Sequence, residues 1–381
     1  MARVIIVGGG IGGLTTALAF CRKGWEVSVH EATPELAPVG KGIWVPINAM
    51  QVLERLGLAK QISDRGWPLQ AIELGTVTGA AISTLRLDEL ALKYGYTITS
   101  IRRADLVEAL ANALPSGVLH LGRRFTHFVQ DSAQVCAHFE DGPEERGDLL
   151  VGADGIHSRV REQLFPGVRL RYSGQTCFRG IAEIALSEEL AGTCREIWGG
   201  KNRFGFAAVG PRQVYWFAPQ LSPPGVRDPL EARKTMLAQR YSDFPDPIPK
   251  ILADTRTDEI LRTDLFDFSP IPSWCGERVA LIGDAAHAMT PNLGQGGAQA
   301  IEDAFVLAEQ CGQAASLGAA LGNYERMRMP KVKWIVNTAW NFGQLAHWQN
   351  PLARWVRDAG IRWTPKSVER KQMERICGLD Y

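Results

Sequence analysis

The sequence predicts an α/β fold in which a parallel-sheet domain carries an inserted mixed β-sheet domain and is followed by a helical C-terminal segment. Three observations predict this class: a glycine-rich turn between an apolar run and a helix within residues 4–22, strand-rich sequence across 166–275, and a tryptophan-rich helical pattern beyond residue 330. At 381 residues, the chain is long enough for two domains or one large interleaved one.

The first element is the stretch VIIVGGGIGG at residues 4–13. We expect a buried strand at 4–7, a helix at 14–22 and a second strand in EVSVHEA that ends at Glu31. Gly8, Gly10 and Gly13 form G-x-G-x-x-G, which permits a tight turn, close approach of a pyrophosphate and close helix–strand contact. Glu31 stands where a carboxylate accepts ribose hydroxyls. The stretch predicts a dinucleotide site rather than an export signal, because glycines disfavour a signal helix by roughly 1 kcal/mol each.

Composition narrows the class of protein. The 42 Lys and Arg nearly balance the 41 Asp and Glu, which gives no reason to expect a nucleic-acid partner. Seven scattered cysteines without C-x-x-C suit a reducing compartment and free thiols. We therefore expect a cytoplasmic protein with no integral membrane segment and no metal site.

Two later stretches again run from a buried strand into a helix. DLLVGADGIHSRVR, from residue 148, contains Asp154-Gly155, and RVALIGDAAHAMTPNLGQGGAQAIE, from residue 278, contains Gly283-Asp284. In the second stretch Pro291 fixes a backbone torsion, and the glycines that follow leave N–H groups uncovered at a helix N-terminus. Such an end carries about half a positive charge. This arrangement suits an anionic ligand.

In this order and at these distances, the three motifs resemble the single-component FAD-dependent aromatic hydroxylases, the class A flavoprotein monooxygenases, from Val4 to about Lys331. The resemblance implies a Rossmann-like FAD-binding domain at 1–70, 101–165 and 276–330, and a substrate domain at 71–100 and 166–275. A helical segment at 331–381 follows. Within this family, the order and spacing of the motifs resemble the short branch that contains urate hydroxylase, tetracycline-modifying and zeaxanthin-epoxidase-like enzymes.

The resemblance also implies roles for single residues around a tightly but non-covalently bound FAD. The segment GKGIWVPINAMQVLERLGL would line the isoalloxazine, although the family more often has a small residue where Lys41 stands. The family's arginine at a helix start is best matched by Arg103, with Arg102 as the alternative. The implied cofactor-binding residues are Gly8, Gly10, Gly13, Glu31, Ile43, Arg103, Asp154, Asp284, Gly294, Gly296 and Gly297.

The reaction implied is hydroxylation of an aromatic or heteroaromatic small molecule through a C4a-hydroperoxyflavin, with O2 and a transiently bound NADH or NADPH. No second G-x-G-x-x-G occurs for a resident nicotinamide nucleotide. Urate hydroxylases tend to be acidic where Asn292 stands, so a quinolone, polyketide or indole-like substrate is open. The alternatives are another FAD-dependent oxidoreductase, namely an epoxidase, reductase or halogenase, and a non-enzymatic FAD-binding protein.

Substrate recognition is expected on a hairpin formed by RFGFAAV and QVYWFAP around Gly210-Pro211-Arg212. If paired residues sum to 422, one face carries Arg203, Ala207, Tyr215 and Phe217, and the other carries Phe204, Phe206, Val214 and Trp216. The first face suits an aromatic substrate with one anionic or carbonyl oxygen, although a solvated edge arginine and a packing tyrosine remain alternatives. The candidate catalytic residues are Arg203, Tyr215, Pro291 and Asn292.

Two further features are expected to be structural or peripheral. His287 reads as a hydrogen-bonding spacer and His157 as exposed. The tail could cap the active site, form a homodimer contact or lie on a membrane surface, although it lacks a lysine-rich flank. Its tryptophans are Trp334, Trp340, Trp348, Trp355 and Trp363.

Overall fold

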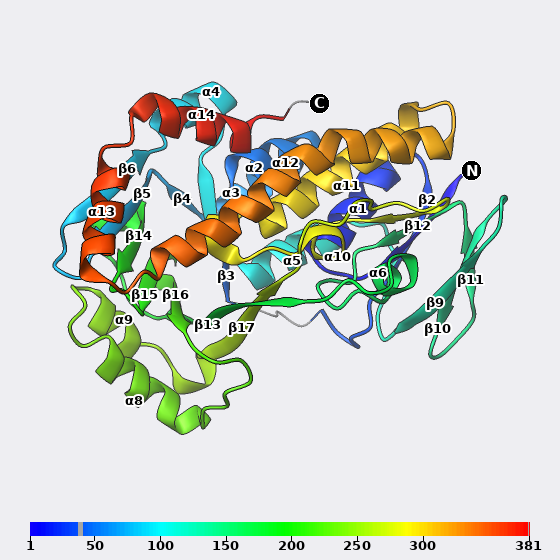
Figure 1. Ribbon diagram of the computed structural model, residues 1–381. Coiled ribbons are helices and arrows are strands. Elements are labelled where there is room, and N and C mark those ends of the chain that lie inside the picture. The colour runs from blue at the N-terminus through cyan, green and yellow to red at the C-terminus, as the bar shows by residue number, and fades with distance from the viewer. Residues whose placement is uncertain (37–40, 380) are drawn as a thin grey trace.

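The computed structural model describes residues 1–36, 41–379 and 381 (Figure 1). Residue 40, the first of the expected isoalloxazine-lining segment, lies outside this part of the chain. A five-stranded sheet holds the N-terminus, and every neighbouring pair in it is parallel. In spatial order its strands are β18 (Val279–Leu281), β12 (Leu149–Gly152), β1 (Arg3–Val7), β2 (Glu26–His30) and β8 (Leu119–His120).

Apolar runs explain this sheet, because strands that are covered on both faces are apolar along their whole length. Residues 4–7 and 149–152 are buried throughout. Helix α1 (Ile11–Arg22) packs against α11 (Gly296–Gln313). It begins three residues before the expected start, because Gly10 is extended and caps it, and β2 ends one residue before Glu31.

Two smaller sheets flank this domain. One is antiparallel and consists of β9 (Phe125–Gln130), β10 (Val135–Phe139) and β11 (Glu145–Gly147). The other pairs β3 (Gly42–Val45), β7 (Ile98–Arg102) and β4 (Trp67–Leu69). The second of these sheets contains part of the predicted flavin segment and contacts the seven-stranded sheet through β15.

The seven-stranded sheet contains the predicted hairpin. Its order is β17 (Leu261–Asp267), β13 (Arg171–Ala182), β16 (Gln213–Leu221), β15 (Arg203–Gly210), β14 (Thr193–Trp198), β5 (Ala71–Thr76) and β6 (Ala81–Arg86). Gly205 pairs with Phe217 and Ala207 with Tyr215, which confirms the register in which paired numbers sum to 422. The face predicted to pack does so: Phe204, Phe206, Val214 and Trp216 share a core with residues of α8 (Leu230–Arg240) and α9 (Ile248–Ala253).

Helices cover these sheets. Helix α12 passes through Pro330 without a break, so the boundary expected at 330/331 falls inside it. Among the described residues, no helix is both long enough and apolar enough to cross a bilayer. The remaining helices are α2 (Ile47–Arg55), α3 (Ala59–Arg65), α4 (Asp88–Tyr94), α5 (Arg103–Asn112), α6 (Arg159–Leu164), α7 (Glu188–Ala191), α8 (Leu230–Arg240), α9 (Ile248–Ala253), α10 (Asp284–His287), α12 (Leu317–Ala346), α13 (Pro351–Arg362) and α14 (Lys366–Cys377).

Candidate active site

A cavity of about 570 Å³ lies where the glycine turn after β1, the starts of α5, α10 and α11, and one face of the seven-stranded sheet meet. It brings together segments that are far apart in the chain. The predicted site residues that line it are Gly10, Ile43, Arg103, Arg203, Tyr215, Asp284, Pro291, Asn292, Gly294, Gly296 and Gly297. Four predicted residues do not line the cavity themselves but lie in or beside the turns that form its wall: Gly8, Gly13, Glu31 and Asp154.

The glycines of the first turn have different tasks. Gly8 has φ +108°, and a Cβ there would lie 2.3 Å from the Ala153 carbonyl oxygen. A Cβ on Gly13 would lie 1.9 Å from the Gly8 oxygen, so both residues permit the turn itself. A Cβ on Gly10 would meet no atom of the described chain within 4 Å. Gly10 therefore leaves open the space into which a pyrophosphate would fit.

Glu31 holds the same turn from the end of β2. One of its oxygens, Oε2, accepts from the Gly9 N–H at 2.7 Å, and the other, Oε1, accepts from the Thr33 N–H at 2.9 Å. This places the carboxylate directly beside the dinucleotide turn, as the sequence predicted. Each carboxylate oxygen of Glu31 therefore already accepts a hydrogen bond from a backbone N–H of the protein.

The two aspartates of the later motifs differ in surroundings. The Asp154 carboxylate accepts from the Ser158 hydroxyl at 2.5 Å and from the Arg159 N–H at 2.8 Å, so it supports the start of α6, whose N-cap is Ser158. Burial raises the pKa of Asp154, and these hydrogen bonds oppose that rise. Any contact of this turn with a ligand would come through its backbone, since Ala153 and Gly155 line the cavity. Asp284, in contrast, is exposed at the cavity wall.

Two arginines bring positive charge to the cavity. Arg103 begins α5, and burial lowers the pKa of its guanidinium, while Asp284 opposes this effect and Arg179 adds to it. No described carboxylate lies within ion-pair distance of either arginine. Arg179, on β13, donates to the Thr263 hydroxyl at 2.6 Å. Partly buried cations without a described counter-ion favour an anionic ligand.

Sequence reasoning missed Arg179 as well as Glu196. The available signal was a charged residue in a segment already expected to be a strand, but the strand pairing was needed to decide which face it would occupy.

The start of α11 is open to the cavity, as predicted. Gly294 has φ +63° and ends the 3-10 turn Pro291–Leu293. Gly296 and Gly297 form the first helical positions of an 18-residue helix. Free N–H groups and the helix dipole favour negative charge at this point.

Arg203 forms the centre of a buried polar cluster on the hairpin wall. Its Nε donates to Glu196 Oε1 at 2.6 Å, and its Nη1 donates to Asn292 Oδ1 at 2.9 Å. Trp198 Nε1 also donates to Glu196, at 2.9 Å. Arg203 is therefore neither a solvated edge residue nor an uncompensated cation. Because Asn292 donates in turn to Thr290 Oγ1 and to the Ala339 carbonyl, the side chain of Asn292 is fixed.

Tyr215 lines the cavity next to Arg179. Burial raises the pKa of Tyr215 to about 12, although the Arg179 charge opposes the shift, so the phenol stays protonated at neutral pH. Its ring packs on Gly42, where a Cβ would lie 2.2 Å from the ring. Trp44 and Phe217 meet edge to face at 5.7 Å and add apolar wall. The wall thus combines aromatic surface with a neutral hydrogen-bond donor.

His347 lies near Arg203 at the end of α12 and is buried. Its Nδ1 is 3.0 Å from the Gly343 carbonyl oxygen. Burial, together with the Arg203 charge, lowers the pKa of His347 to about 4. An unfolded chain would have a histidine pKa of about 6.5.

This shift predicts a pH dependence of stability. Between pH 6.5 and 4 the unfolded chain binds this proton more readily than the folded protein does, so stability rises with pH in that window. The contribution of His347 is complete above about pH 6.5 and is lost as the pH falls toward 4. We expect it to fall by about 2 kcal/mol between pH 7.5 and pH 5. Urea unfolding at both values, with excess FAD, should show a smaller pH effect in His347→Gln than in the wild type; equal effects would contradict the prediction.

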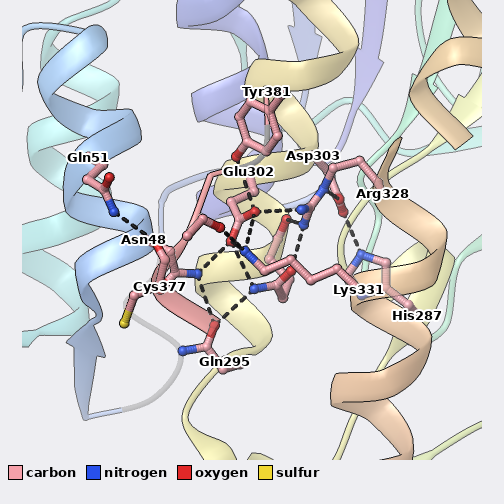
Figure 2. Close-up of polar contacts among 12 residues, drawn as sticks. Asn48, Gln51, His287, Gln295, Glu302, Asp303, Arg328, Lys331, Cys377 and Tyr381 are labelled. Carbon is pink, nitrogen blue, oxygen red and sulfur yellow. Dashed lines mark hydrogen bonds and ion pairs between the residues drawn. The ribbon is translucent and has the colours of Figure 1, made fainter. Parts of the chain in front are cut away.

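A buried ionic network stabilises the helices behind the cavity (Figure 2). Arg328 of α12 pairs with Glu302 at 2.5 Å and with Asp303 at 2.8 Å, both on α11. His287 Nε2 lies 2.5 Å from Asp303 Oδ2, so its surroundings agree with the structural role predicted for it. The Tyr381 hydroxyl donates to Glu302 at 3.1 Å, which ties the last residue to α11.

One group of three possible metal ligands occurs among the described residues. Side-chain atoms of Cys136, His138 and Glu144 lie within 4.8 Å of one another on the small antiparallel sheet. Arg146 already binds Glu144 at 2.8 Å. The arginine's charge at this position disfavours a cation.

Comparisons with known proteins agree with this geometry. Residues 1–339 match the family described as FAD binding domain. The chain is 38% identical to aurachin C monooxygenase/isomerase of Stigmatella aurantiaca, over 94% of this chain and 93% of the relative. It is 32% identical to 2-heptyl-3-hydroxy-4(1H)-quinolone synthase of Pseudomonas aeruginosa strain UCBPP-PA14, over 98% and 97%.

A solved structure supports the same conclusion. Klebsiella pneumoniae HpxO, complexed with FAD and uric acid, superposes with a TM-score of 0.90 at 27% identity and covers 98% of this chain and 95% of that chain. The glycine turn, the open start of α11 and the cavity between the two large sheets thus occur in a chain that matches this family over most of its length. The chain belongs to the FAD binding domain family and is an FAD-dependent monooxygenase of the aromatic-hydroxylase type.

Proposed function

We propose that the protein hydroxylates a neutral heteroaromatic compound bearing a carbonyl oxygen, specifically a 4-quinolone with an alkyl chain, using O2 and NADH or NADPH. When bound, FAD supplies the redox chemistry: it accepts hydride from the nicotinamide and activates O2. The protein's residues hold the cofactor, orient the substrate and exclude water.

The observation that carries this proposal is the ion pair between Arg203 and Glu196 on the substrate wall. From the sequence, either an anionic or a carbonyl oxygen was open as the partner of Arg203. With Glu196 at 2.6 Å, the arginine already has its counter-ion, so an anionic substrate would also meet the Glu196 charge. A neutral carbonyl can still accept a hydrogen bond without bringing a second negative charge. Tyr215, protonated at neutral pH, offers a further donor.

The residues present fit the cofactor. The space beside Gly10 and the unpaired guanidinium of Arg103 suit the pyrophosphate, and Glu31 suits the adenosine ribose. Asp284 would accept from ribityl hydroxyls, and Ile43 would contact the ring system. Gly294, Gly296 and Gly297 would place N–H groups at the edge that becomes negative on reduction.

The cavity wall on the side of the seven-stranded sheet would orient the substrate and exclude water. Trp44, Phe217 and Pro219 give it apolar surface, which suits a fused aromatic ring with an alkyl chain. Pro291 and Asn292 border the same space, and Arg203 fixes the Asn292 amide. The relatives' names include an aurachin monooxygenase and a heptyl-quinolone synthase, which supports this substrate class.

A substrate screen tests the proposal. 2-Alkyl-4-quinolones, urate, salicylate and indole should be compared for acceleration of NADH and NADPH oxidation by the FAD-loaded enzyme, with mass spectrometry of the products. We expect the quinolones to stimulate oxidation and gain one oxygen atom. Stimulation by urate or salicylate alone would overturn the proposed class, and no stimulated oxidation by any aromatic compound would overturn the reaction.

FAD retention should depend on Asp284. Asp284→Ala removes a charge-assisted hydrogen bond of roughly 1.5–3 kcal/mol, so we expect FAD to bind roughly 10- to 150-fold more weakly without loss of stability in the apoprotein. Titration of the apoprotein with FAD, followed by flavin fluorescence, measures this change. Asp154→Ala is the comparison: it should lower apoprotein stability by about 1 kcal/mol, because the first N–H groups of α6 lose their acceptor, and weaken FAD less. Full FAD affinity in Asp284→Ala would contradict the assignment.

A further inference from the structure

Helix α13 presents an apolar face that nothing in the described chain covers. Leu352, Trp355, Val356 and Trp363 are 69%, 65%, 54% and 74% exposed. Their spacing places them, with Ala359, on one side of the helix. The opposite side packs inward, where the Arg357 guanidinium lies 4.6 Å from the centre of the Trp198 ring. Figure 1 shows α13 at the outer edge of the molecule, beside β6.

Basic side chains lie at the C-terminal end of this face and on the helix that follows it. Arg362 is exposed near the C-terminal end of α13, and Lys366, Arg370 and Lys371 are exposed on α14. Two of the three acidic residues on the described helices α13 and α14 form ion pairs. Asp358 pairs with Arg357 and Glu374 with Lys93, and Glu369 accepts a hydrogen bond from Ser83. The sequence pattern of the tail lacks a lysine-rich flank. In the fold, positive charge next to α13 comes instead from Arg362 and from the basic residues of α14.

We propose that this outer face of α13 docks the protein on an anionic lipid bilayer surface. Tryptophans with leucine and valine on one helix face, bordered by Arg and Lys, favour the interface between headgroups and acyl chains. The helix would lie in the plane of the surface, because no described helix could span it. This inference is independent of the substrate that the cavity takes.

A second copy of the chain is the competing occupant. In a two-fold symmetric contact each α13 would face its own copy, and the basic borders would face each other. Of the three carboxylates on the described helices α13 and α14, Glu369 alone lies outside an ion pair, so it offsets only part of this repulsion. The charge pattern therefore favours an anionic lipid surface over a second copy of the chain.

Vesicle flotation of the full-length, FAD-loaded protein tests the inference. We expect binding to an equal mixture of phosphatidylcholine and phosphatidylglycerol, weaker binding at high salt, and little binding to phosphatidylcholine alone. Trp355→Ser/Trp363→Ser should lower the partition coefficient roughly tenfold or more while FAD content stays at the wild-type level.

A matched pair of variants separates this face from general surface hydrophobicity. Val356→Ser removes a 54% exposed valine from α13, and Val129→Ser removes a 57% exposed valine from β9. We expect vesicle binding to weaken roughly threefold for Val356→Ser and to stay at the wild-type level for Val129→Ser. Equal binding to neutral and anionic vesicles, or no binding to either, would overturn the proposal. So would a dimer that the double tryptophan variant dissociates and that vesicles do not disperse.

Discussion

The Arg203→Met variant is expected to oxidise NAD(P)H in the presence of substrate but to release most of the reduced oxygen as hydrogen peroxide. Arg203 holds Asn292 through a 2.9 Å hydrogen bond and lines the substrate wall, so its loss should misplace the substrate. Misplacement of a reacting group can cost on the order of 100-fold. The ratio of peroxide to hydroxylated product, measured on the true substrate, should rise accordingly.

The same substitution should also destabilise the fold. It leaves the Glu196 carboxylate buried without its counter-ion, and breaking such a pair costs roughly 3–5 kcal/mol. Arg203→Met/Glu196→Gln removes both charges and should recover much of this loss in urea unfolding. It should not recover coupling, because the link to Asn292 remains absent. A single variant that stays coupled at the wild-type rate would show that the hairpin wall is only structural.

Arg328→Met should have the largest effect on folding. Arg328 is buried and neutralises two buried carboxylates, Glu302 and Asp303, and its charge helps to hold the pKa of Asp303 below its usual value against burial. Leaving both carboxylates without this partner should cost roughly 3–5 kcal/mol or more, and soluble yield should fall sharply.

Arg326→Met provides the matched control for this variant. Arg326 lies on the same helix, is exposed and bonds only to Asn323 among the described side chains, so the change should stay within about 0.5 kcal/mol. Urea unfolding of the two variants, or thermal unfolding where Arg328→Met is too unstable, compares them directly. Similar stability of both would show that the network contributes little.

The sequence predicted the hairpin and its register because alternation along two strands leaves few options. The large apolar residues at 204, 206, 214 and 216 lie on one face only if the numbers of two paired residues add up to an even number near 422. The glycine turn was equally predictable, since its backbone geometry excludes side chains at Gly8 and Gly13.

What the sequence could not supply was the partner of each polar group. Glu196 reaches Arg203 only because β14 pairs with β15, and Asp154 turns toward α6 because Ser158 and Arg159 offer donors there. The helix through Pro330 was also missed. Proline opposes helix propensity, but buried residues on both sides, Arg328 and Val332 among them, fix the helix by tertiary packing.

Along the strands of the substrate wall, side chains that face the cavity alternate with side chains that face the core, and this alternation affects how the protein can evolve. On the central strands β13, β15 and β16 the cavity side chains carry odd numbers, and the even-numbered neighbours form the core with α8 and α9. Substitutions at odd positions can therefore reshape the space for a new compound while the packed face keeps its volume. A lineage with this sheet could diversify its substrates by point mutation along alternate residues. Arg203 is the exception, because its buried ion pair with Glu196 stabilises the fold.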